Sequence, residues 1–324
     1  MKANQFIPLK RLAYMTCIGM FIVVLNGALV TKTGSGMGCG TDWPLCNGKF
    51  VPAYTIESMI EYSHRFITGI VGLLVLLTFI LTLRQAKDKR DAVLYSSSTL
   101  LFTIVQAIMG ALAVVFTQNP PVMALHFGFS LLAFASSFLM CMAMRKYAQG
   151  QVTHRNQAAR PVQEVFRYGV WFTLLYTYIV IYVGAFVRHT DSSGGCMGWP
   201  LCNGELIPEL TGGTLIAFMH RIAAALLFVV VAIMAHFAYH HHKDNREIQQ
   251  LGIWSMILCA GQIVSGALVV FTITDMNTLL FTSLLHTVLI CGLFSVLCYM
   301  SIRVWQLREL PQAESSSESM STEG

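Results

Sequence analysis

Residues 63–83 read SHRFITGIVGLLVLLTFILTL, a stretch that is almost entirely apolar and carries charge only near its start. An α-helix crosses the hydrocarbon core of a bilayer with about 20 mostly apolar residues, so this stretch predicts a membrane span. Further stretches of the same kind occupy about 12–30, 95–116, 122–144, 169–187, 215–239, 251–273 and 278–302. We therefore predict an all-α membrane protein with eight transmembrane helices.

The composition agrees with a polytopic membrane protein. Apolar residues make up 55% of the 324 residues and charged residues only 11%, whereas soluble domains carry about 25% charged residues. The formal net charge is +5, and the basic residues lie in short segments between the apolar stretches. Binding to nucleic acid requires a clustered basic face, so the composition excludes that class together with the soluble enzymes.

The distribution of lysine and arginine predicts the orientation in the membrane. With an even number of spans, both termini lie on one side, and 16 Lys and Arg residues fall in the segments on that side. The opposite loops hold only Lys32, Lys49 and Arg188. Because cytoplasmic loops carry the excess of positive charge, we expect cytoplasmic termini and extracellular opposite loops.

An internal repeat divides the chain into two related halves. The sequence WPLCNG at 43–48 returns at 199–204, an offset of 156 residues. At the same offset, HR at 64–65 returns at 220–221. The first four spans therefore match the last four, and an even number of helices in each repeat keeps both copies in the same orientation.

The repeat predicts two fused, parallel four-helix bundles. We expect the first bundle at 1–145 and the second at 169–303, joined by a cytoplasmic linker at 146–168. The remaining segment, 304–324, is rich in Ser and Glu towards its end and is expected to be a disordered cytoplasmic tail. Each bundle should carry a related site.

Among the histidines inside predicted spans, four lie at matching places in the two repeats: His64, His126, His220 and His286. An ionisable residue within a membrane is costly and marks a functional site by default. The second and fourth helices of an up-and-down bundle are diagonally opposed, so each pair can supply both axial ligands of a haem near the outer side. The alternatives are histidines that only pack helices together, or a transition-metal site, for which the spans offer few carboxylates or thiolates.

Two pairs of cysteines, Cys39 with Cys46 and Cys196 with Cys202, occupy equivalent loops rich in Gly, Pro and Trp. An oxidising outer environment favours a disulfide within each loop. Zinc binding is the alternative, although zinc sites usually use C-x2-4-C pairs and these pairs are C-x6-C and C-x5-C.

Glu61 breaks the symmetry of the repeat. It stands three residues before His64, near the same helix face, whereas Ala217 occupies the equivalent position of the second repeat. A carboxylate beside only one histidine pair suggests that this site performs chemistry while the other holds a cofactor. Alternatively, a glutamate near the start of a helix is favoured by the helix dipole.

Together these motifs resemble the haem A synthases, in particular the short bacterial, Bacillus-like members of that family. The resemblance covers almost the whole chain and rests on GSGMGC at 34–39, WPLC at 43–46, EYSHRF at 61–66, ALHFG at 124–128, HR at 220–221 and the late His286. Members of the family have eight spans in two related halves. They oxidise the C8 methyl group of haem O to a formyl group, with water as the oxygen source, to give haem A for terminal oxidases.

The resemblance implies a role for each candidate residue. His64 and His126 would ligate the iron of the substrate haem O, and Glu61 would be the catalytic carboxylate beside the methyl group. His220 and His286 would ligate the iron of a haem b cofactor. The two cysteine pairs would be extracellular disulfides. The resemblance also implies a bacterial cell membrane, with an electron acceptor and a haem O synthase (a protohaem farnesyltransferase) as partners.

The residues alone leave two other functions open. A di-haem b-type electron carrier that oxidises quinol would need the four histidines and the repeat, but neither Glu61 nor the cysteine loops. A membrane protein that oxidises thiols would use the cysteine loops and leave the histidines unexplained.

Overall fold

The computed structural model describes residues 6–43, 45–50, 54–116, 119–150 and 161–308. This part of the chain contains eight helices that are long and apolar enough to cross a membrane. They are α1 (Ile7–Lys32), α2 (Ile56–Gln85), α3 (Arg90–Val115), α4 (Pro120–Ala148), α5 (Glu164–His189), α6 (Gly212–His241), α7 (Arg246–Phe271) and α8 (Met276–Gln306). The predicted number and order of the spans are confirmed, and the protein is a multi-pass membrane protein. The predicted tail beyond 308 and the centre of the predicted linker lie outside the described residues.

Most helices extend several residues beyond the apolar stretches that predicted them. Helix α2 begins at Ile56 because the Thr55 side chain caps it, accepting a hydrogen bond from the Ser58 backbone N–H. Helix α7 instead ends at Phe271, two residues before the predicted limit. There the Thr272 hydroxyl donates to the Leu268 carbonyl at 2.8 Å, and the chain turns towards Asp275, which caps α8.

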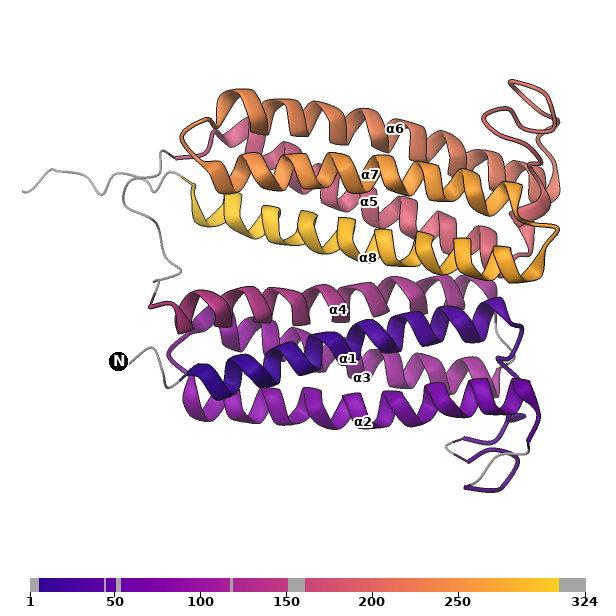
Figure 1. Ribbon diagram of the computed structural model, residues 1–324, viewed down its shortest axis with the longest axis horizontal. Helices are drawn as coiled ribbons and strands as arrows, with labels where there is room; N and C mark the ends of the chain where they lie inside the picture. The colour runs from indigo at the N-terminus through magenta and orange to yellow at the C-terminus, as the bar shows by residue number, and fades with distance from the viewer. Residues whose placement is uncertain (1–5, 44, 51–53, 117–118, 151–160, 309–324) are drawn as a thin grey trace, which may run out of the picture.

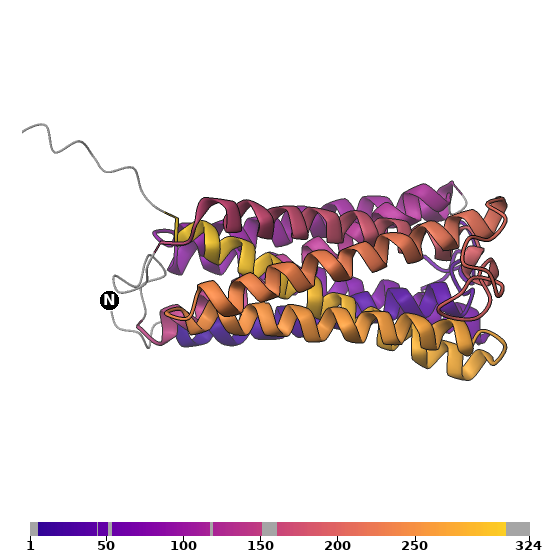
Figure 2. The ribbon, with the colours of Figure 1, turned by 90° about the horizontal axis from the view of Figure 1, so that it is seen from above.

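Helices α1–α4 form one group and α5–α8 form a second group beside it. All of these helices run roughly parallel to the long axis of the molecule (Figure 1). In the first bundle α1 and α3 each pack against α2 and α4, and in the second α5 and α7 each pack against α6 and α8. Helices α2 and α4, and likewise α6 and α8, are therefore diagonally opposed. The described parts of the loop after α1, residues 33–43, 45–50 and 54–55, lie at the same end of the molecule as the loop at 190–211 (Figures 1 and 2). We call this end the Cys-loop end.

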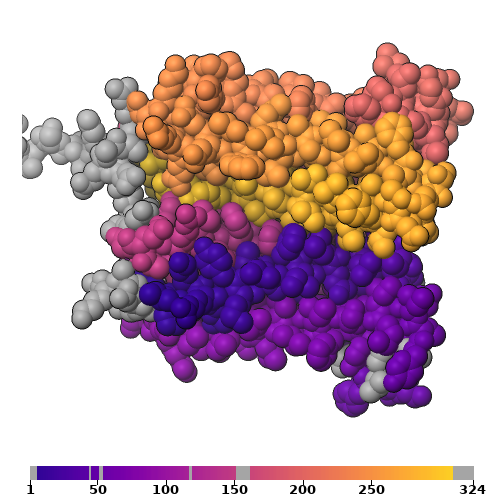
Figure 3. Space-filling model, in the orientation of Figure 1, coloured from indigo at the N-terminus to yellow at the C-terminus, as the bar shows by residue number. Residues whose placement is uncertain are grey.

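Four helices join the bundles. Helices α1 and α4 of the first bundle contact α8 of the second, and α4 also contacts α5. The boundary between the early and late halves of the chain is visible on the surface, where α1 and α4 meet α8 (Figure 3). The join is close at Gly128, where an added Cβ would lie 2.7 Å from the Tyr178 hydroxyl oxygen of α5.

Charged side chains reinforce the join at the end opposite the cysteine loops. Lys146 on α4 contacts the Glu247 carboxylate of α7 at 3.1 Å, and Arg303 on α8 contacts the other carboxylate oxygen of Glu247 at 2.8 Å. The Tyr299 hydroxyl donates to Glu247 at 2.6 Å. This network connects both bundles through a single carboxylate.

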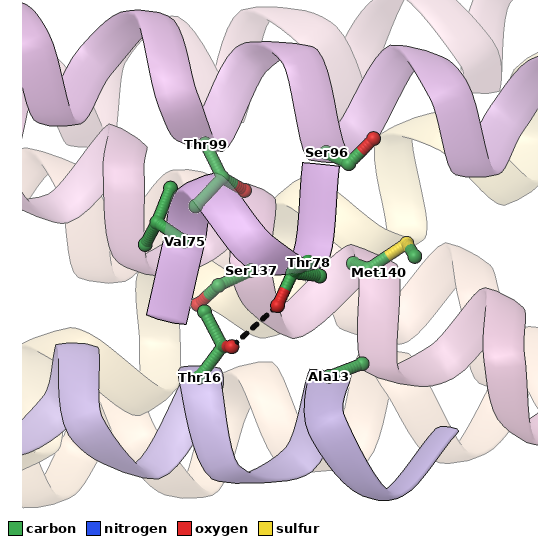
Figure 4. Close-up of a pocket in the computed structure, with 8 residues that line it drawn as sticks. All are labelled: Ala13, Thr16, Val75, Thr78, Ser96, Thr99, Ser137 and Met140. Atoms are coloured by element: carbon green, nitrogen blue, oxygen red, sulfur yellow. Dashed lines mark hydrogen bonds between the residues drawn. The ribbon is translucent and has the colours of Figure 1, made fainter. Parts of the chain in front are cut away.

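A small polar cavity lies within the first bundle (Figure 4). Its lining residues are Ala13, Thr16, Val75, Thr78, Ser96, Thr99, Ser137 and Met140. The hydroxyl oxygens of Thr16 and Thr78 lie 2.7 Å apart, and Thr78 donates its proton to the Leu74 carbonyl at 2.8 Å. Thr16 is therefore the donor between these two helices. In the second repeat, the buried Met234 takes the place of Thr78, and Gly252 takes the place of Ser96.

Candidate functional site

The four paired histidines, His64, His126, His220 and His286, lie in the part of their helices nearest the Cys-loop end. His64 on α2 and His126 on α4 are close enough to interact electrostatically, as are His220 on α6 and His286 on α8. Each predicted pair is thus brought together across the diagonal of its bundle. Each of the four residues is half-buried.

Each imidazole lies against a glycine of the preceding helix. An added Cβ on Gly27, Gly110, Gly184 or Gly266 would lie 3.2, 3.6, 2.7 or 3.4 Å from Cε1 of His64, His126, His220 or His286, respectively. A larger residue would push the ring away, most severely at Gly184. The same histidine–glycine contact therefore occurs four times, twice in each bundle. The sequence analysis did not single out these glycines, although Gly110 and Gly266 lie in a segment that repeats.

The ring nitrogens of three of these histidines are free for a ligand. Neither nitrogen of His64, His126 or His220 makes a hydrogen bond within the described part of the chain, and their Nδ1 atoms are enclosed. Enclosed nitrogens without partners are costly, which points to a bound group that the histidines serve. Neutral imidazole is the usual axial ligand of haem iron.

His286 is held differently. The Ser265 hydroxyl donates a hydrogen bond to the Gln262 carbonyl at 3.0 Å. It therefore accepts a hydrogen bond from the Nδ1–H of His286, 2.8 Å away. The lone pair of His286 is then on Nε2, which the Gln262 amide contacts at 2.9 Å. This tautomer is the one that binds iron through Nε2. In the first bundle Met109 takes the place of Ser265, and Gln106 donates to the His126 carbonyl at 2.6 Å instead of its ring.

Haem suits these histidines better than a bare metal ion. Within the described ranges, no group of three or more His, Cys, Asp or Glu side chains converges on a possible metal position. A haem needs only two protein ligands for its iron, because the porphyrin supplies the other four, and two histidines in each bundle could provide them. The residues present therefore fit a haem in each bundle.

Glu61 is buried and ties the first cysteine loop to α2. It is 4% exposed, and its carboxylate accepts a hydrogen bond from the Cys39 backbone N–H at 2.8 Å. Its other oxygen pairs with Arg65 at 2.6 Å. The acidic residue in the first turn of α2 is Glu57, so Glu61 stands beyond the reach of a simple helix-end effect. Glu61 therefore places a buried carboxylate about one helical turn from His64 on α2.

An arginine clamps the cysteine loop in both repeats. Arg65 donates to the Asp42 and Leu45 carbonyls at 2.7 and 2.6 Å. Its counterpart Arg221 donates to the Leu201 and Cys196 carbonyls at 3.0 and 2.6 Å. The clamp is therefore common to both bundles. The sequence analysis gave neither arginine a role, although both lie in the repeated HR pair.

The carboxylate is specific to the first bundle. Ala217, which is buried, occupies the position of Glu61 in the second repeat. Arg221 therefore holds its loop through backbone carbonyls alone. The second bundle shows that an arginine can hold a loop of this kind without a carboxylate.

Both cysteine loops contain the disulfide expected from the sequence. Cys39 is bonded to Cys46, and Cys196 is bonded to Cys202. All four cysteines are buried. Gly38 and Gly195 let the loops lie directly on α2 and α6, since an added Cβ on either would lie 2.4 Å from helix backbone.

The chain is similar to a known protein family and to curated proteins. Residues 10–59 and 53–298 match the model of a family described as cytochrome oxidase assembly protein. The haem A synthase of Alkalihalophilus pseudofirmus is 38% identical over 91% of this chain and 96% of its own length. That of Bacillus licheniformis is 39% identical over 94% of this chain and 98% of its own. The chain belongs to the haem A synthase family.

The match extends over the whole candidate site. A Bacillus cereus haem A synthase is 41% identical over 90% of this chain and 92% of its own length. The residues matched by the family model include all four histidines, Glu61 and both cysteine pairs. Family membership thus confirms the resemblance that the sequence motifs predicted.

Proposed function

We propose that this protein is a membrane-bound oxidoreductase that converts haem O to haem A. Specifically, it oxidises the C8 methyl group to a formyl group, with the formyl oxygen taken from water. The balanced change is CH3 + H2O → CHO + 4 H+ + 4 electrons, in two two-electron steps. The observation that carries the proposal is the buried carboxylate of Glu61 beside one histidine pair, with Ala217 at the equivalent place beside the other.

The asymmetry supports a different task for each bundle. His64 and His126, with Glu61 one turn away, would hold the iron of the substrate haem O. His220 and His286 would hold a haem b cofactor, and the hydrogen bond from His286 to Ser265 suits a group that stays bound. When bound, the haems supply one-electron redox chemistry.

Glu61 is suited to accept a proton in this reaction. Its contacts with Arg65 and with the Cys39 N–H fix the position of the carboxylate. From there it would take a proton from the methyl group or from the attacking water. A positioned base of this kind contributes about 10²–10⁴-fold in rate. Its location near the Cys-loop end gives water access without opening the centre of the membrane.

We infer that the cysteine loops face the outside of a bacterial cell and that both termini are cytoplasmic. The excess of Lys and Arg at the end opposite the cysteine loops supports this orientation. The reaction also requires two partners. A haem O synthase (a protohaem farnesyltransferase) would supply the substrate, and an electron acceptor would remove four electrons per turnover.

The test is haem analysis of cells that make haem O and express the full chain. Extracted haems are separated by chromatography, with cells carrying an empty vector as the control. The proposed function predicts haem A only where the chain is expressed, and label from H2¹⁸O in its formyl group. A di-haem electron carrier would give haem b alone, and that result would reject the proposal.

A further inference from the structure

Three basic side chains gather where the bundles meet at the Cys-loop end. Lys32 ends α1, and Arg188 and His189 end α5. Arg188 donates to the Thr31 carbonyl at 2.5 Å, which joins the two helix ends directly. Its nearby acid is Asp191, 3.3 Å away, whose side chain is 91% exposed. The group therefore carries an excess of positive charge.

Lys32 and His189 lack partners for their polar atoms. Within the residues that the structure describes, neither makes a hydrogen bond or an ion pair, although both are half-buried. Nε of Arg188 is enclosed and also has no partner. Partly buried cationic and polar groups without partners are costly. A bound anion would satisfy all three side chains at once.

The position of this basic group relates it to both histidine pairs. Helices α1 and α5 each pack against both α4 and α8, which carry His126 and His286. Lys32 lies within electrostatic range of His286, and His189 lies within range of His126. His189 also occupies in the second repeat the place that Lys32 has in the first. Each repeat thus places a basic residue within electrostatic range of a histidine of the other.

We propose that Lys32, Arg188 and His189 form an anion site that binds the propionate carboxylates of the two haems. Lys32 serves the haem of the second bundle, and His189 serves the haem of the first. Arg188 holds the two helix ends together and offers its remaining N–H groups to either carboxylate. The site rests on the proposed function only in that each bundle holds a haem. Charge-assisted hydrogen bonds from such donors are about twice as strong as neutral ones.

The test is a redox titration of the purified full-length haem protein, followed by optical spectroscopy. Lys32→Gln and His189→Gln are compared with Lys49→Gln, which changes an exposed lysine of the first cysteine loop. Each variant is also titrated in a His126→Ala background, which holds only the haem of the second bundle. That background assigns each spectral change to one bundle.

Removal of a positive charge close to a haem disfavours the reduced form. Lys32→Gln should lower the equilibrium constant for reduction of the second bundle's haem by about tenfold, which is about 59 mV for a one-electron couple. His189→Gln removes a ring N–H donor to the propionate of the first bundle's haem and should lower the potential of that haem, and Lys49→Gln should shift neither. The anion site would be overturned if Lys32→Gln shifted only the first bundle's haem and His189→Gln only the second's, or if neither variant shifted a potential. Absence of haem from the purified protein would instead reject the proposed function.

A lipid phosphate is the other anion with matching chemistry. The titrations are therefore repeated in dodecyl maltoside without lipid and in phosphatidylglycerol nanodiscs. Propionate binding predicts the same Lys32→Gln shift in both. If the unaltered protein changes potential on moving into phosphatidylglycerol, and Lys32→Gln abolishes that change, the site binds lipid and the proposal is wrong.

Discussion

Glu61 and Arg65 are joined at 2.6 Å across one turn of α2, and both side chains are largely buried. Arg221 makes no such contact, because Ala217 stands where the carboxylate would be. The second bundle thus holds its loop with alanine at this position, whereas the first bundle has a glutamate there that is buried and paired with an arginine. Loop anchoring alone does not account for Glu61, and its charge can be tested directly.

Glu61→Gln should fold, retain haem b, and accumulate haem O or a hydroxymethyl intermediate. The glutamine oxygen can still accept from the Cys39 N–H, but the side chain cannot accept a proton during the reaction. We expect haem A formation to fall by about 10²–10⁴-fold, measured by chromatography of extracted haems. Glu57→Gln, which changes an exposed glutamate of the same helix, is the matched control and should be nearly normal. Near-normal haem A in Glu61→Gln would leave Glu61 as a loop anchor only.

Arg65→Gln should loosen the first cysteine loop and leave the second unchanged. The variant loses charged hydrogen bonds worth about 1.5–3 kcal/mol each and leaves Glu61 without its cation. Limited reduction, alkylation and mass mapping should show the Cys39–Cys46 bond reduced at least about tenfold faster. Arg221→Gln should have the same effect on Cys196–Cys202 alone. Equal reduction of both disulfides in either variant would show that the clamps do not act locally.

Replacement of single histidines should separate the two haems. His220→Ala or His286→Ala removes an axial ligand of the cofactor and should eliminate most haem b from the purified protein. His64→Ala or His126→Ala should spare haem b and reduce binding of haem O. Pyridine haemochrome spectra and chromatography measure both. Equal loss of haem b in all four variants would contradict the division of tasks between the bundles.

The hydrogen bond to His286 allows a finer test of that division. Ser265→Ala removes the partner of Nδ1 and should weaken haem b binding by about 10–100-fold. Ser130→Ala is the control, because Ser130 bonds the Gln106 side chain and the His126 carbonyl and touches no ring nitrogen. Retention of haem b through successive detergent washes gives the comparison. Equal retention in both variants would show that Ser265 does not orient the ligand.

The hydroxyl pair in the polar cavity should contribute to stability as a unit. Thr78→Val leaves the Thr16 proton without an acceptor, and Thr16→Val removes the same bond from the other side. Hydrogen bonds between membrane helices contribute about 0.6 kcal/mol on average and at most about 1.7. The destabilisation of the double variant in thermal unfolding should therefore be smaller than the sum of the single effects. Thr173→Val is the control, since Thr173 bonds only within its own helix. Strictly additive effects would contradict the coupling.

The sequence predicted the helices and the histidine pairs because both follow from local pattern and from the repeat. The length of each apolar stretch predicts a membrane span, and the return of HR at 220–221 predicts that His220 pairs with His286 as His64 pairs with His126. The environment of Glu61 was beyond such reasoning. Its partners Cys39 and Arg65 meet it only because the loop folds back onto α2, and that approach depends on Gly38. The sequence shows that Glu61 is present but does not show which residues contact its carboxylate.

The contacts between bundles were equally beyond prediction. In the sequence, His189 and Arg188 occupy the place that Lys32 has in the first repeat, but the repeat does not show which bundle each basic residue serves. Their relation to His286 and His126 depends on how α1 and α5 pack across the boundary. Neither apolar length nor repeat spacing determines which faces of two bundles meet.

The packing of α1 against α8 is mirrored by that of α5 against α4, and Lys32 and His189 cross the boundary in the same reciprocal way. This is the geometry of an isologous dimer, in which residue i of one subunit meets residue j of the other and the reverse contact also forms. Here the two subunits are halves of one chain. A homodimer would have to place the same side chain in both bundles, so it could not carry Glu61 on one side and Ala217 on the other. Because the two repeats are fused into one chain, their sequences can differ while the geometry of the dimer is kept. A reactive site can therefore lie beside an unreactive one.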